Sequence, residues 1–514
     1  LIGHFAGQTG EDNTAVGSYA LQTTTQGLRN TAVGMSAMKS GDCADDNTAV
    51  GNLALKVFTG SDAVAVGSGA ADAATSATGL TAVGYNALGA CTDGTGNTAV
   101  GKDAGATLTT GDYNTALGAL ALDDSVIDTQ KNTAIGYGAL SGACTNDNTG
   151  VGYFSLVNFT GSNATAVGAG AADAATSAAQ LVAVGKDAAG VITTATDVTA
   201  IGYQSLKAVT TTTLGGYSTA VGSYAGKNFI RGSNTVIGYA AAMNVGYGRN
   251  NTAIGVNAML GASSAAGSIN SCGYAQTATT ITCTSNATIN TDQRVTGTDI
   301  AEGTYVTAIT GGYGSVTSFV ISQATTNASG GTLAGQTLDF YQTNADDCVA
   351  IGASALGAIT TGDFNTAVGY AAGAATTTGA RNVFVGASTA PTNTTGSYNT
   401  GVGGRGSDNY NVLNSNTSGA RLTALGAGAL SRNVDGNDNT AIGAYALGRN
   451  TTSDNNTAVG RSALAASTSA SNTAVGFQAV GVGVLTGGDN VVVGKGAALN
   501  ATGMATSVFI GYQS

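Results

Sequence analysis

The chain has very few of the residues on which catalysis usually depends. Its 514 residues include one proline, one histidine and no tryptophan, and only 9% are charged. No nucleophile motif surrounds the single histidine, His4, so a Ser-His-Asp site is not indicated. Glycine-rich stretches are common, but none has the spacing of a phosphate-binding loop. We therefore expect no enzyme activity, no catalytic residue and no cofactor.

The charge pattern also excludes several partner classes. The formal net charge of −11 is spread thinly, and Lys and Arg form no patch. Nucleic acid is therefore not an expected partner. No apolar run is long enough to span a bilayer as a helix. The chain does not begin with Met and no secretory signal is visible; both ends fall inside repeats. A fragment, a processed product and a subunit whose coils continue into a neighbour all fit that observation.

Six cysteines are present without a Cys-x-x-Cys pair, so a zinc site is not indicated. Cys272 and Cys283 flank a short segment and are candidates for a disulfide across a hairpin, although spacing alone does not establish the bond. Cys43, Cys91 and Cys144 lie in loops too far apart to pair, and we expect small, partly buried thiols there. Aspartates that precede some repeat asparagines are not in neighbouring coils, so no metal array is expected.

What the chain has in abundance is a repeat of about 17 residues. Its glycine occurs 16 times up to Gly255 and, after a gap, 10 times from Gly352 onward, which gives about 26 copies. A period this short and regular is typical of a solenoid in which each repeat is one coil. The residues that define the repeat most clearly are Asn13, Val16, Gly17, Asn30, Gly34, Asn47, Gly51, Asn97, Gly101, Asn365, Gly369, Asn456 and Gly460.

One coil reads as Asn-Thr-Ala-Val-Gly-x-x-Ala-Leu followed by polar turn residues. Alternation predicts a strand with Thr and Val on one face and Asn and Ala on the other. The glycine is expected at a corner that needs a positive φ or a close backbone approach. We interpret x-x-Ala-Leu as a second short extended segment. Two strands and two turns make a flattened coil, or β-roll; a three-sided helix of roughly 18 residues per turn is the alternative.

Stacking places each repeat asparagine above the next. The amides can then form a coil-to-coil ladder, or each asparagine can cap the turn before its strand. Cys348 replaces the asparagine and is expected to interrupt the ladder. The persistent alanine indicates close packing, against the opposite wall of the same coil or against a second chain. Because one thin roll buries little surface, a homo-oligomer is favoured.

The sequence divides into a β-solenoid of 16 coils over 1–260, an inserted small all-β module over 261–347, and a β-solenoid of 10 coils over 348–514. The module is either a receptor contact or a spacer. A long coil between Gly403 and Gly426 carries Arg405, Asp408 and Tyr410, a candidate recognition loop. A surface loop that has lengthened without any binding role is the alternative explanation for the length of this coil.

The repeat resembles the head β-roll repeats of trimeric autotransporter adhesins (YadA-like). It is also similar to shaft repeats of phage tail fibres, through Thr133–Tyr137, Thr199–Tyr203 and Thr366–Tyr370. This resemblance covers about 430 of the 514 residues. It implies a parallel homotrimer of left-handed β-rolls and adhesion to a cell surface. The coil here is longer than in the adhesin heads, and no coiled-coil stalk, membrane anchor or chaperone domain is visible.

These observations favour a structural fibre or adhesin shaft, extracellular, on a cell surface or on a virion, that presents or spaces a surface-binding region. Its expected partners are further copies of itself and a cell-surface receptor or glycan. One alternative is a subunit of a cellular extracellular filament that polymerises end to end through open terminal coils. A second alternative is a solenoid that itself binds ice or glycans through rows of threonine.

Overall fold

The computed structural model describes residues 3, 12–124, 128–194, 196–207, 216–229, 232–246, 248–261, 267–275, 280–283, 294–296, 306–310, 318–321, 332–341, 345–405, 410–481 and 485–513. For most strand residues between 267 and 341 it describes the backbone alone. The described residues form strands and turns without any α-helix, and so contain no helix able to cross a membrane. Contacts divide the chain into two compact units, 1–218 and 219–514.

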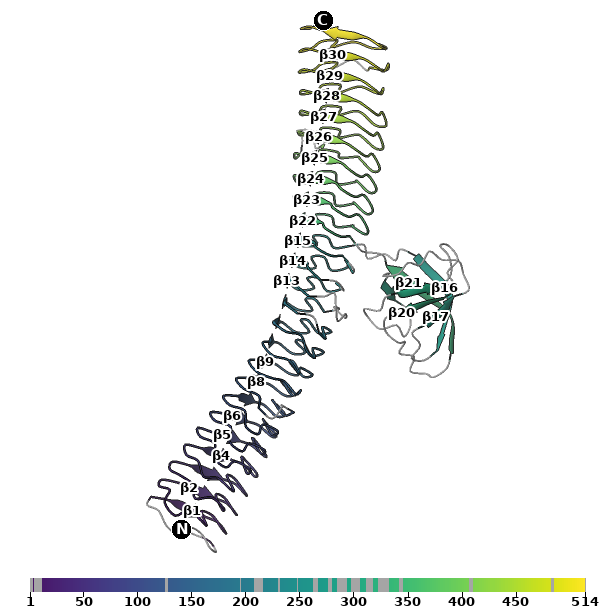
Figure 1. Ribbon diagram of the computed structural model, residues 1–514. Coiled ribbons are helices and arrows are strands. Elements are labelled where there is room, and N and C mark those ends of the chain that lie inside the picture. The colour runs from purple at the N-terminus through teal and green to yellow at the C-terminus, as the bar shows by residue number, and fades with distance from the viewer. Residues whose placement is uncertain are drawn as a thin grey trace. The chain divides into compact units, whose positions relative to one another are not determined.

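Unit 1 is a β-solenoid with one short strand in each coil (Figure 1). Consecutive strands pair in parallel and in register, so that Thr14 lies beside Thr31 and Ala15 beside Ala32. Parallel pairing of one coil on the next is the arrangement that the 17-residue period predicts. The strands are β1 (Thr14–Val16), β2 (Thr31–Val33), β3 (Thr48–Val50), β4 (Val64–Val66), β5 (Thr81–Val83), β6 (Thr98–Val100), β7 (Thr115–Leu117), β8 (Thr133–Ile135), β9 (Thr149–Val151), β10 (Thr165–Val167), β11 (Leu181–Val184) and β12 (Val198–Ile201).

Unit 2 contains a second β-solenoid of the same kind, with strands β13 (Thr219–Val221), β14 (Thr235–Ile237), β15 (Thr252–Ile254), β22 (Val349–Ile351), β23 (Thr366–Val368), β24 (Val383–Val385), β25 (Thr400–Val402), β26 (Thr423–Leu425), β27 (Thr440–Ile442), β28 (Thr457–Val459), β29 (Thr473–Val475), β30 (Val491–Val493) and β31 (Val508–Ile510). Strand β15 pairs directly with β22, with Thr252 beside Val349. The coils therefore continue in register across the residues inserted between these two strands.

The inserted residues of unit 2 form a six-stranded antiparallel sheet in the order β18-β21-β16-β17-β20-β19. Its strands are β16 (Gly267–Ala275), β17 (Thr280–Cys283), β18 (Arg294–Thr296), β19 (Val306–Thr310), β20 (Ser318–Ile321) and β21 (Thr332–Tyr341). An all-β insert is thus present where the repeat spacing breaks. The sequence-based boundaries at 260/261 and 347/348 stay predictions.

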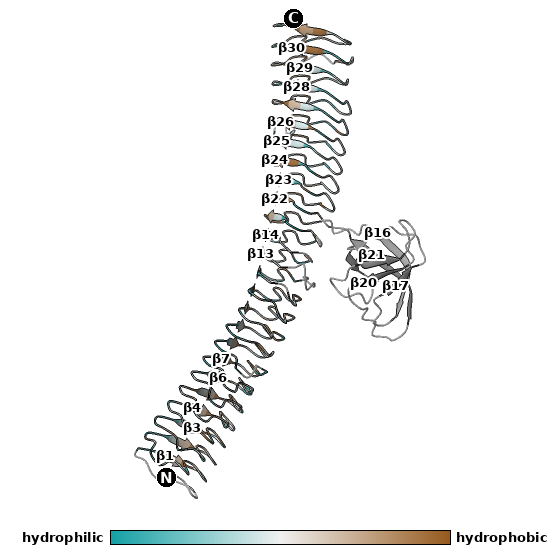
Figure 2. Ribbon diagram, viewed as in Figure 1, coloured by the Kyte–Doolittle hydropathy of each residue, from teal (hydrophilic) through white to brown (hydrophobic). Residues whose placement is uncertain are grey.

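The core of each solenoid is the inside of its coils. The strand alanine and the leucine of x-x-Ala-Leu point inward, and Ala15 and Leu21 are 0% and 2% exposed. The strand Thr and Val side chains face outward, as alternation predicts. The small alanine therefore packs against the opposite wall of its own coil, which is one of the two alternatives left open by the sequence. Figure 2 shows hydrophobic residues concentrated on the strands.

The interpretation of x-x-Ala-Leu as a second extended segment is wrong. Tyr19 and Leu21 have φ values of 59° and 50°, in the left-handed region, and the same alternation recurs from coil to coil. A β-strand requires negative φ, and each left-handed L-residue costs about 1–2 kcal/mol. Hydrogen bonds between coils offset that cost: Ser36 N–H donates to Ser18 O at 2.8 Å, and Leu21 N–H donates to Ala37 O at 3.1 Å. Each coil consequently has one strand and a hydrogen-bonded turn segment.

Both expected reasons for the repeat glycine are confirmed at Gly17. Its φ is 135°, and a Cβ there would lie 2.5 Å from the carbonyl oxygen of Gly34 in the next coil. A side chain would force adjacent coils apart at the corner that follows each strand.

Candidate interaction surfaces

An asparagine ladder holds the start of most solenoid strands from the inside. Asn47 is fully buried, and its backbone N–H donates to Asn30 Oδ1 at 2.9 Å. Its Nδ2 donates to the carbonyl oxygens of Ala44 in its own turn and Gly60 in the next coil, both at 3.0 Å. The same residue thus caps its turn and joins neighbouring coils, so the two roles weighed from the sequence occur together. In some coils the amides also bond directly, as from Asn114 Nδ2 to Asn97 Oδ1 at 3.1 Å.

Cys348 was expected to interrupt the ladder, but the chain of hydrogen bonds continues through it. Cys348 N–H donates to Asn251 Oδ1 at 2.9 Å, and the next asparagine, Asn365, directs its N–H to Cys348 Sγ at 3.5 Å. The sulfur occupies the place of the amide oxygen, as a weaker acceptor. Other residues take the ladder position elsewhere: Ala63, Leu80, Ala164, Leu181, Val198 and Ser218 in unit 1, and Leu422 and Ser507 in unit 2.

A second buried asparagine column was missed by the sequence reasoning. Asn416 Nδ2 donates to Asn393 Oδ1 at 2.8 Å, and Asn433 Nδ2 donates to Asn416 Oδ1 at 2.9 Å. Asn450 continues the column at 2.8 Å, and all four side chains are 0% exposed. The signal was present, because each of these residues stands six positions before a ladder position. Earlier coils fill the equivalent position with apolar residues such as Phe58 and Leu108.

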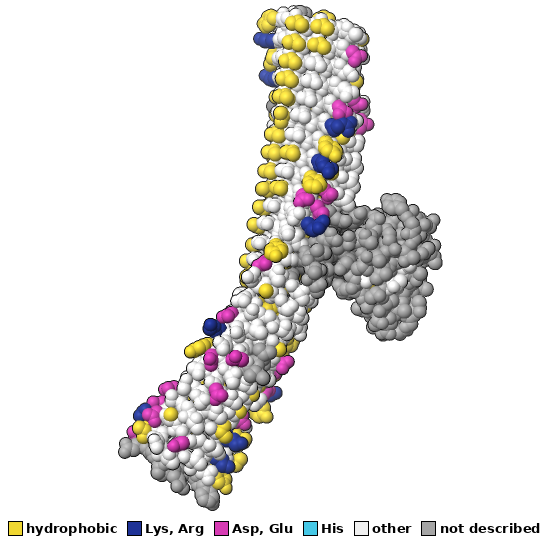
Figure 3. Space-filling model, in the orientation of Figure 1, with side chains coloured by type: hydrophobic (Ala, Val, Ile, Leu, Met, Phe, Trp, Pro, Cys, Tyr) yellow, Lys and Arg dark blue, Asp and Glu magenta, His cyan; other side chains and the backbone are white. Residues whose placement is uncertain are grey.

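The outward side chains of the strands form two rows. One row is mainly threonine, and the other is valine, isoleucine or leucine. In unit 2, Ile351, Ile442 and Val475 are each 38% exposed. Figure 3 shows hydrophobic side chains as a continuous stripe along the edge that carries strands β22–β30. Since their backbones are paired on both sides, these strands offer side chains alone to a partner. We call this surface the strand face.

The residues that directly precede the ladder position form a third external row, and each of them has a positive φ in the left-handed region. We call this the left-handed row. In unit 2 the Arg381 guanidinium lies 5.0 Å from the Phe364 ring and 5.5 Å from the Tyr398 ring. Further along, Arg421 Nε donates to Asp438 Oδ1 at 2.6 Å. This hydrogen bond and the charge of the guanidinium hold the pKa of Asp438 below its usual range. Stacked positions select complementary side chains here, and Figure 3 shows the alternation.

The candidate recognition loop is partly described. Six extra residues follow Gly403, because Leu413 stands ten positions after its glycine whereas Ala390 stands four after Gly386. Asp408 lies outside the described residues, and Arg405 is exposed. Tyr410 is held by Arg432, whose guanidinium lies 5.1 Å from the ring and donates to the hydroxyl at 3.2 Å.

Four cysteines are buried, free thiols: Cys43, Cys91, Cys144 and Cys348. Burial raises the pKa of Cys144 to about 11 and that of Cys348 to about 12. The backbone register of β16 and β17 places Cys272 directly opposite Cys283. Directly opposed residues of antiparallel strands have Cα atoms about 4.5–5.5 Å apart, within the range of a disulfide. The bond itself stays a prediction, since neither side chain is described.

His4 lies outside the described residues. Within the described ranges, no group of three or more His, Cys, Asp or Glu side chains is placed to hold a metal ion. The aspartates before the repeat asparagines occupy the left-handed row, a conformation that Asp and Asn adopt more readily than most residues. Asp46 there pairs with Arg29 at 2.6 Å.

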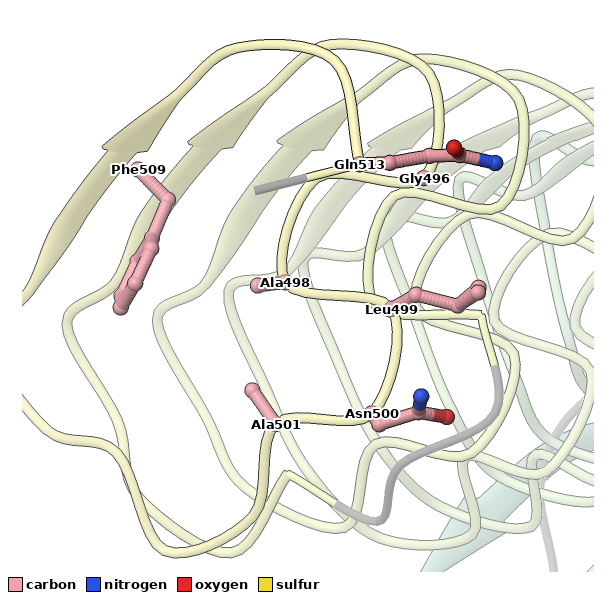
Figure 4. Close-up of a pocket in the computed structure, with 7 residues that line it drawn as sticks. All are labelled: Gly496, Ala498, Leu499, Asn500, Ala501, Phe509 and Gln513. Atoms are coloured by element: carbon pink, nitrogen blue, oxygen red, sulfur yellow. The ribbon is translucent and has the colours of Figure 1, made fainter.

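A cavity of about 460 Å³ lies at the last coil of unit 2. Phe509 takes the inward position on β31 and faces Ala498 and Ala501 (Figure 4). The equivalent residue on β24, Phe384, is fully buried, whereas Phe509 is half-buried because no further described coil covers it. This cavity is the end of the stacked core. Its lining residues are Gly496, Ala498, Leu499, Asn500, Ala501, Phe509 and Gln513.

No protein-family model, no curated protein and no solved structure matches this chain.

Proposed function

We propose that the chain is a structural fibre or adhesin shaft that spaces or presents a surface-binding region outside a cell or on a virion. The observation that supports this proposal best is the in-register parallel stacking of every consecutive coil within each unit, joined by main-chain and asparagine hydrogen bonds. Twelve stacked strands extend on the order of 50 Å in unit 1. A column of this kind resists bending because each coil is bonded along its whole length to the next.

The strand face supports self-association of such a shaft. Its row of partly exposed Val and Ile side chains is continuous (Figure 3), and apolar stripes of this kind gain from burial against another protein surface. The resemblance to trimeric adhesin heads and phage fibres favours a parallel homotrimer. Ile442 and Val475 on this face provide the test, and Ser471, an exposed residue of the left-handed row, provides a control.

The native mass of the purified full chain, measured by light scattering and native mass spectrometry, tests the proposal. We expect three chains for the unmodified protein and for Ser471→Asp. We expect a lower mass for the double variant Ile442→Asp/Val475→Asp, with an unchanged β-type circular dichroism spectrum. A monomeric unmodified protein would remove the trimer, and unlimited fibres in electron micrographs would replace the shaft by an end-to-end filament.

One observation favours the ice-binding alternative. Six consecutive strands of unit 1, β5–β10, carry threonine at the same outward position, stacked in register. Regularly spaced hydroxyl and methyl groups on a flat sheet can order water. A thermal-hysteresis measurement decides between the functions: activity at micromolar protein would favour ice binding, and its absence favours the shaft.

A further inference from the structure

Three aromatic side chains form a cluster on the surface of unit 1. The rings of Tyr137 and Tyr153 lie 5.7 Å apart and within 16° of parallel. Phe154 lies 4.3 Å from Tyr153 and 5.4 Å from Tyr137. The two tyrosines are 45% and 57% exposed, so the cluster is not part of the core. We call Tyr137, Tyr153 and Phe154 the aromatic cluster.

The solenoid backbone holds these rings in place. Tyr137 and Tyr153 follow the repeat glycines of adjacent coils, so they are stacked by the coil register. Phe154 is left-handed, with φ 52°, and its N–H donates to Tyr137 O at 3.0 Å. Its ring lies over Gly138, where an added Cβ would be 2.5 Å from Phe154 Cε1. The glycine therefore allows an edge of the ring to approach the coil closely, and the cluster is preorganised.

Polar side chains continue the same surface on both sides of the cluster. On one side Asn86 Nδ2 donates to Asp103 Oδ1 at 3.0 Å, and Lys102 lies 3.2 Å from Asp103. These residues follow the repeat glycines two and three coils before Tyr137.

On the other side Gln204 Nε2 donates to Asp187 Oδ2 at 3.4 Å, and Lys186 lies 3.6 Å from Asp187. Between Phe154 and this group stand the small residues Ala169 and Gly170, which leave space above the coil. The surface from residue 85 to residue 204 thus has an aromatic centre, small neighbours and hydrogen-bonding groups at both ends.

We propose that this surface binds an extended, neutral, β-1,4-linked polysaccharide chain that runs along the stacked coils. The C–H groups on the face of a pyranose ring carry partial positive charge and pack against the negative face of an aromatic ring. Successive coils are about 4.8 Å apart, close to the length of one sugar residue in an extended chain. Adjacent rings of the cluster can therefore contact adjacent sugars, while the flanking amide, carboxylate and ammonium groups bond to hydroxyls.

The charges favour a neutral sugar. Lys102 and Lys186, the lysines that flank the cluster, are each paired with the aspartate beside them, which makes the flanks a poor site for a carboxylate or sulfate group. This proposal does not depend on the shaft function, since a binding site on the solenoid wall is compatible with any assembly that leaves the wall open.

The test uses the purified full chain with cellohexaose and N-acetylchitohexaose as probes, in calorimetric titrations and saturation-transfer NMR. We expect at least one hexamer to bind, with saturation transfer strongest to the protons on the sugar-ring faces. The double variant Tyr137→Ala/Tyr153→Ala should bind at least tenfold more weakly. Tyr370→Ala should bind as the unmodified protein does. Tyr370 follows a repeat glycine in unit 2, is 64% exposed and therefore matches the tyrosines in position and exposure.

Failure of the folded protein to bind either hexamer would overturn the proposal. So would equal binding by the double variant, or a change in its native mass without any change in binding, which would make the cluster a contact between proteins. If the double variant does not fold, the single variants Tyr137→Ala and Tyr153→Ala are measured in its place, and binding by both that equals that of the unmodified protein would overturn the proposal.

Discussion

Replacing one asparagine of the buried ladder in unit 2 should loosen the coils on either side of it. Asn382 is fully buried, and its side chain makes three hydrogen bonds. Its Nδ2 donates to Asn365 Oδ1 at 3.0 Å and to Gly396 O at 2.9 Å, and its Oδ1 accepts from Asn399 N–H at 2.9 Å. The substitution Asn382→Ala removes all three and leaves the buried N–H of Asn399 without this acceptor, whereas Gly396 O still accepts from Asn393 Nδ2 at 3.1 Å.

The magnitude follows from that one N–H group. A buried polar group left without a partner costs about 1–3 kcal/mol, so we expect about 1–3 kcal/mol of lost local stability. Because each 1.4 kcal/mol is a tenfold change in an equilibrium constant, amide hydrogens of residues 365–399 should exchange about 5- to 150-fold faster. Asn158→Ala is the control, because that exposed side chain makes one hydrogen bond, to Asp173 O at 2.8 Å, which water can replace.

Hydrogen exchange followed by mass spectrometry measures the effect coil by coil, which suits a repeat protein that can open locally. Asn382→Asp adds a pH test. One carboxylate oxygen can still accept from Asn399, but the other would face two acceptors, which raises the carboxyl pKa in the folded state. Stability should then be greatest below the ordinary pKa of an aspartate and fall as the pH rises through the raised value. Unchanged exchange in Asn382→Ala, or a pH-independent Asn382→Asp, would refute the reasoning.

Three further results are expected. Gly369→Ala should prevent normal stacking and lower the urea midpoint of unfolding, because a Cβ there would lie 2.6 Å from a carbonyl carbon of the next coil. A Cβ at Gly404 would meet nothing within 4 Å, so Gly404→Ala should leave the midpoint unchanged. If Cys272 and Cys283 form a disulfide, a thiol reagent should detect four thiols in the denatured, unreduced protein and six after reduction, whereas six before reduction would exclude the bond. The thiols of the native protein should react slowly, because the four described ones are buried. The ion pair between Arg421 and Asp438 stabilises the fold above the ordinary aspartate pKa, and this stabilisation is lost as the pH falls through the lowered pKa of Asp438. Arg421→Ala should therefore flatten the acid side of the profile of stability against pH, and an unaltered profile would contradict this.

Much of each coil could be predicted from the sequence because two signals coincide there. Alternation in Thr14-Ala15-Val16 sets which side chains face inward, and the following glycine sets the corner. The turn segment could not be predicted in the same way, because a left-handed Leu21 contradicts its intrinsic preference and is stabilised only by bonds to the next coil. Local sequence does not carry that information.

For the candidate surfaces, too, some features follow from the repeat pattern and others depend on how the coils stack. The outward strand rows follow from periodicity, so Ile442 and Val475 could be placed in advance. Contacts between rows depend on which coil lies next to which. Arg432 contacts Tyr410 across 22 positions, five more than the 17 that separate the equivalent residues Leu413 and Leu430, so the repeat spacing alone does not pair them. The stacking of Tyr137 on Tyr153 needs the register of adjacent strands. Sequence reasoning had the repeat spacing but did not align the side chains along each row.

Electron cryo-microscopy of the purified chain tests the central claim most directly, since that claim is the stacking of one coil on the next through main-chain hydrogen bonds. The expected density for each unit consists of layers about 4.8 Å apart, each with a single short strand and a glycine corner. Separate compact globules, or helices at the positions where valine and glycine recur, would contradict it.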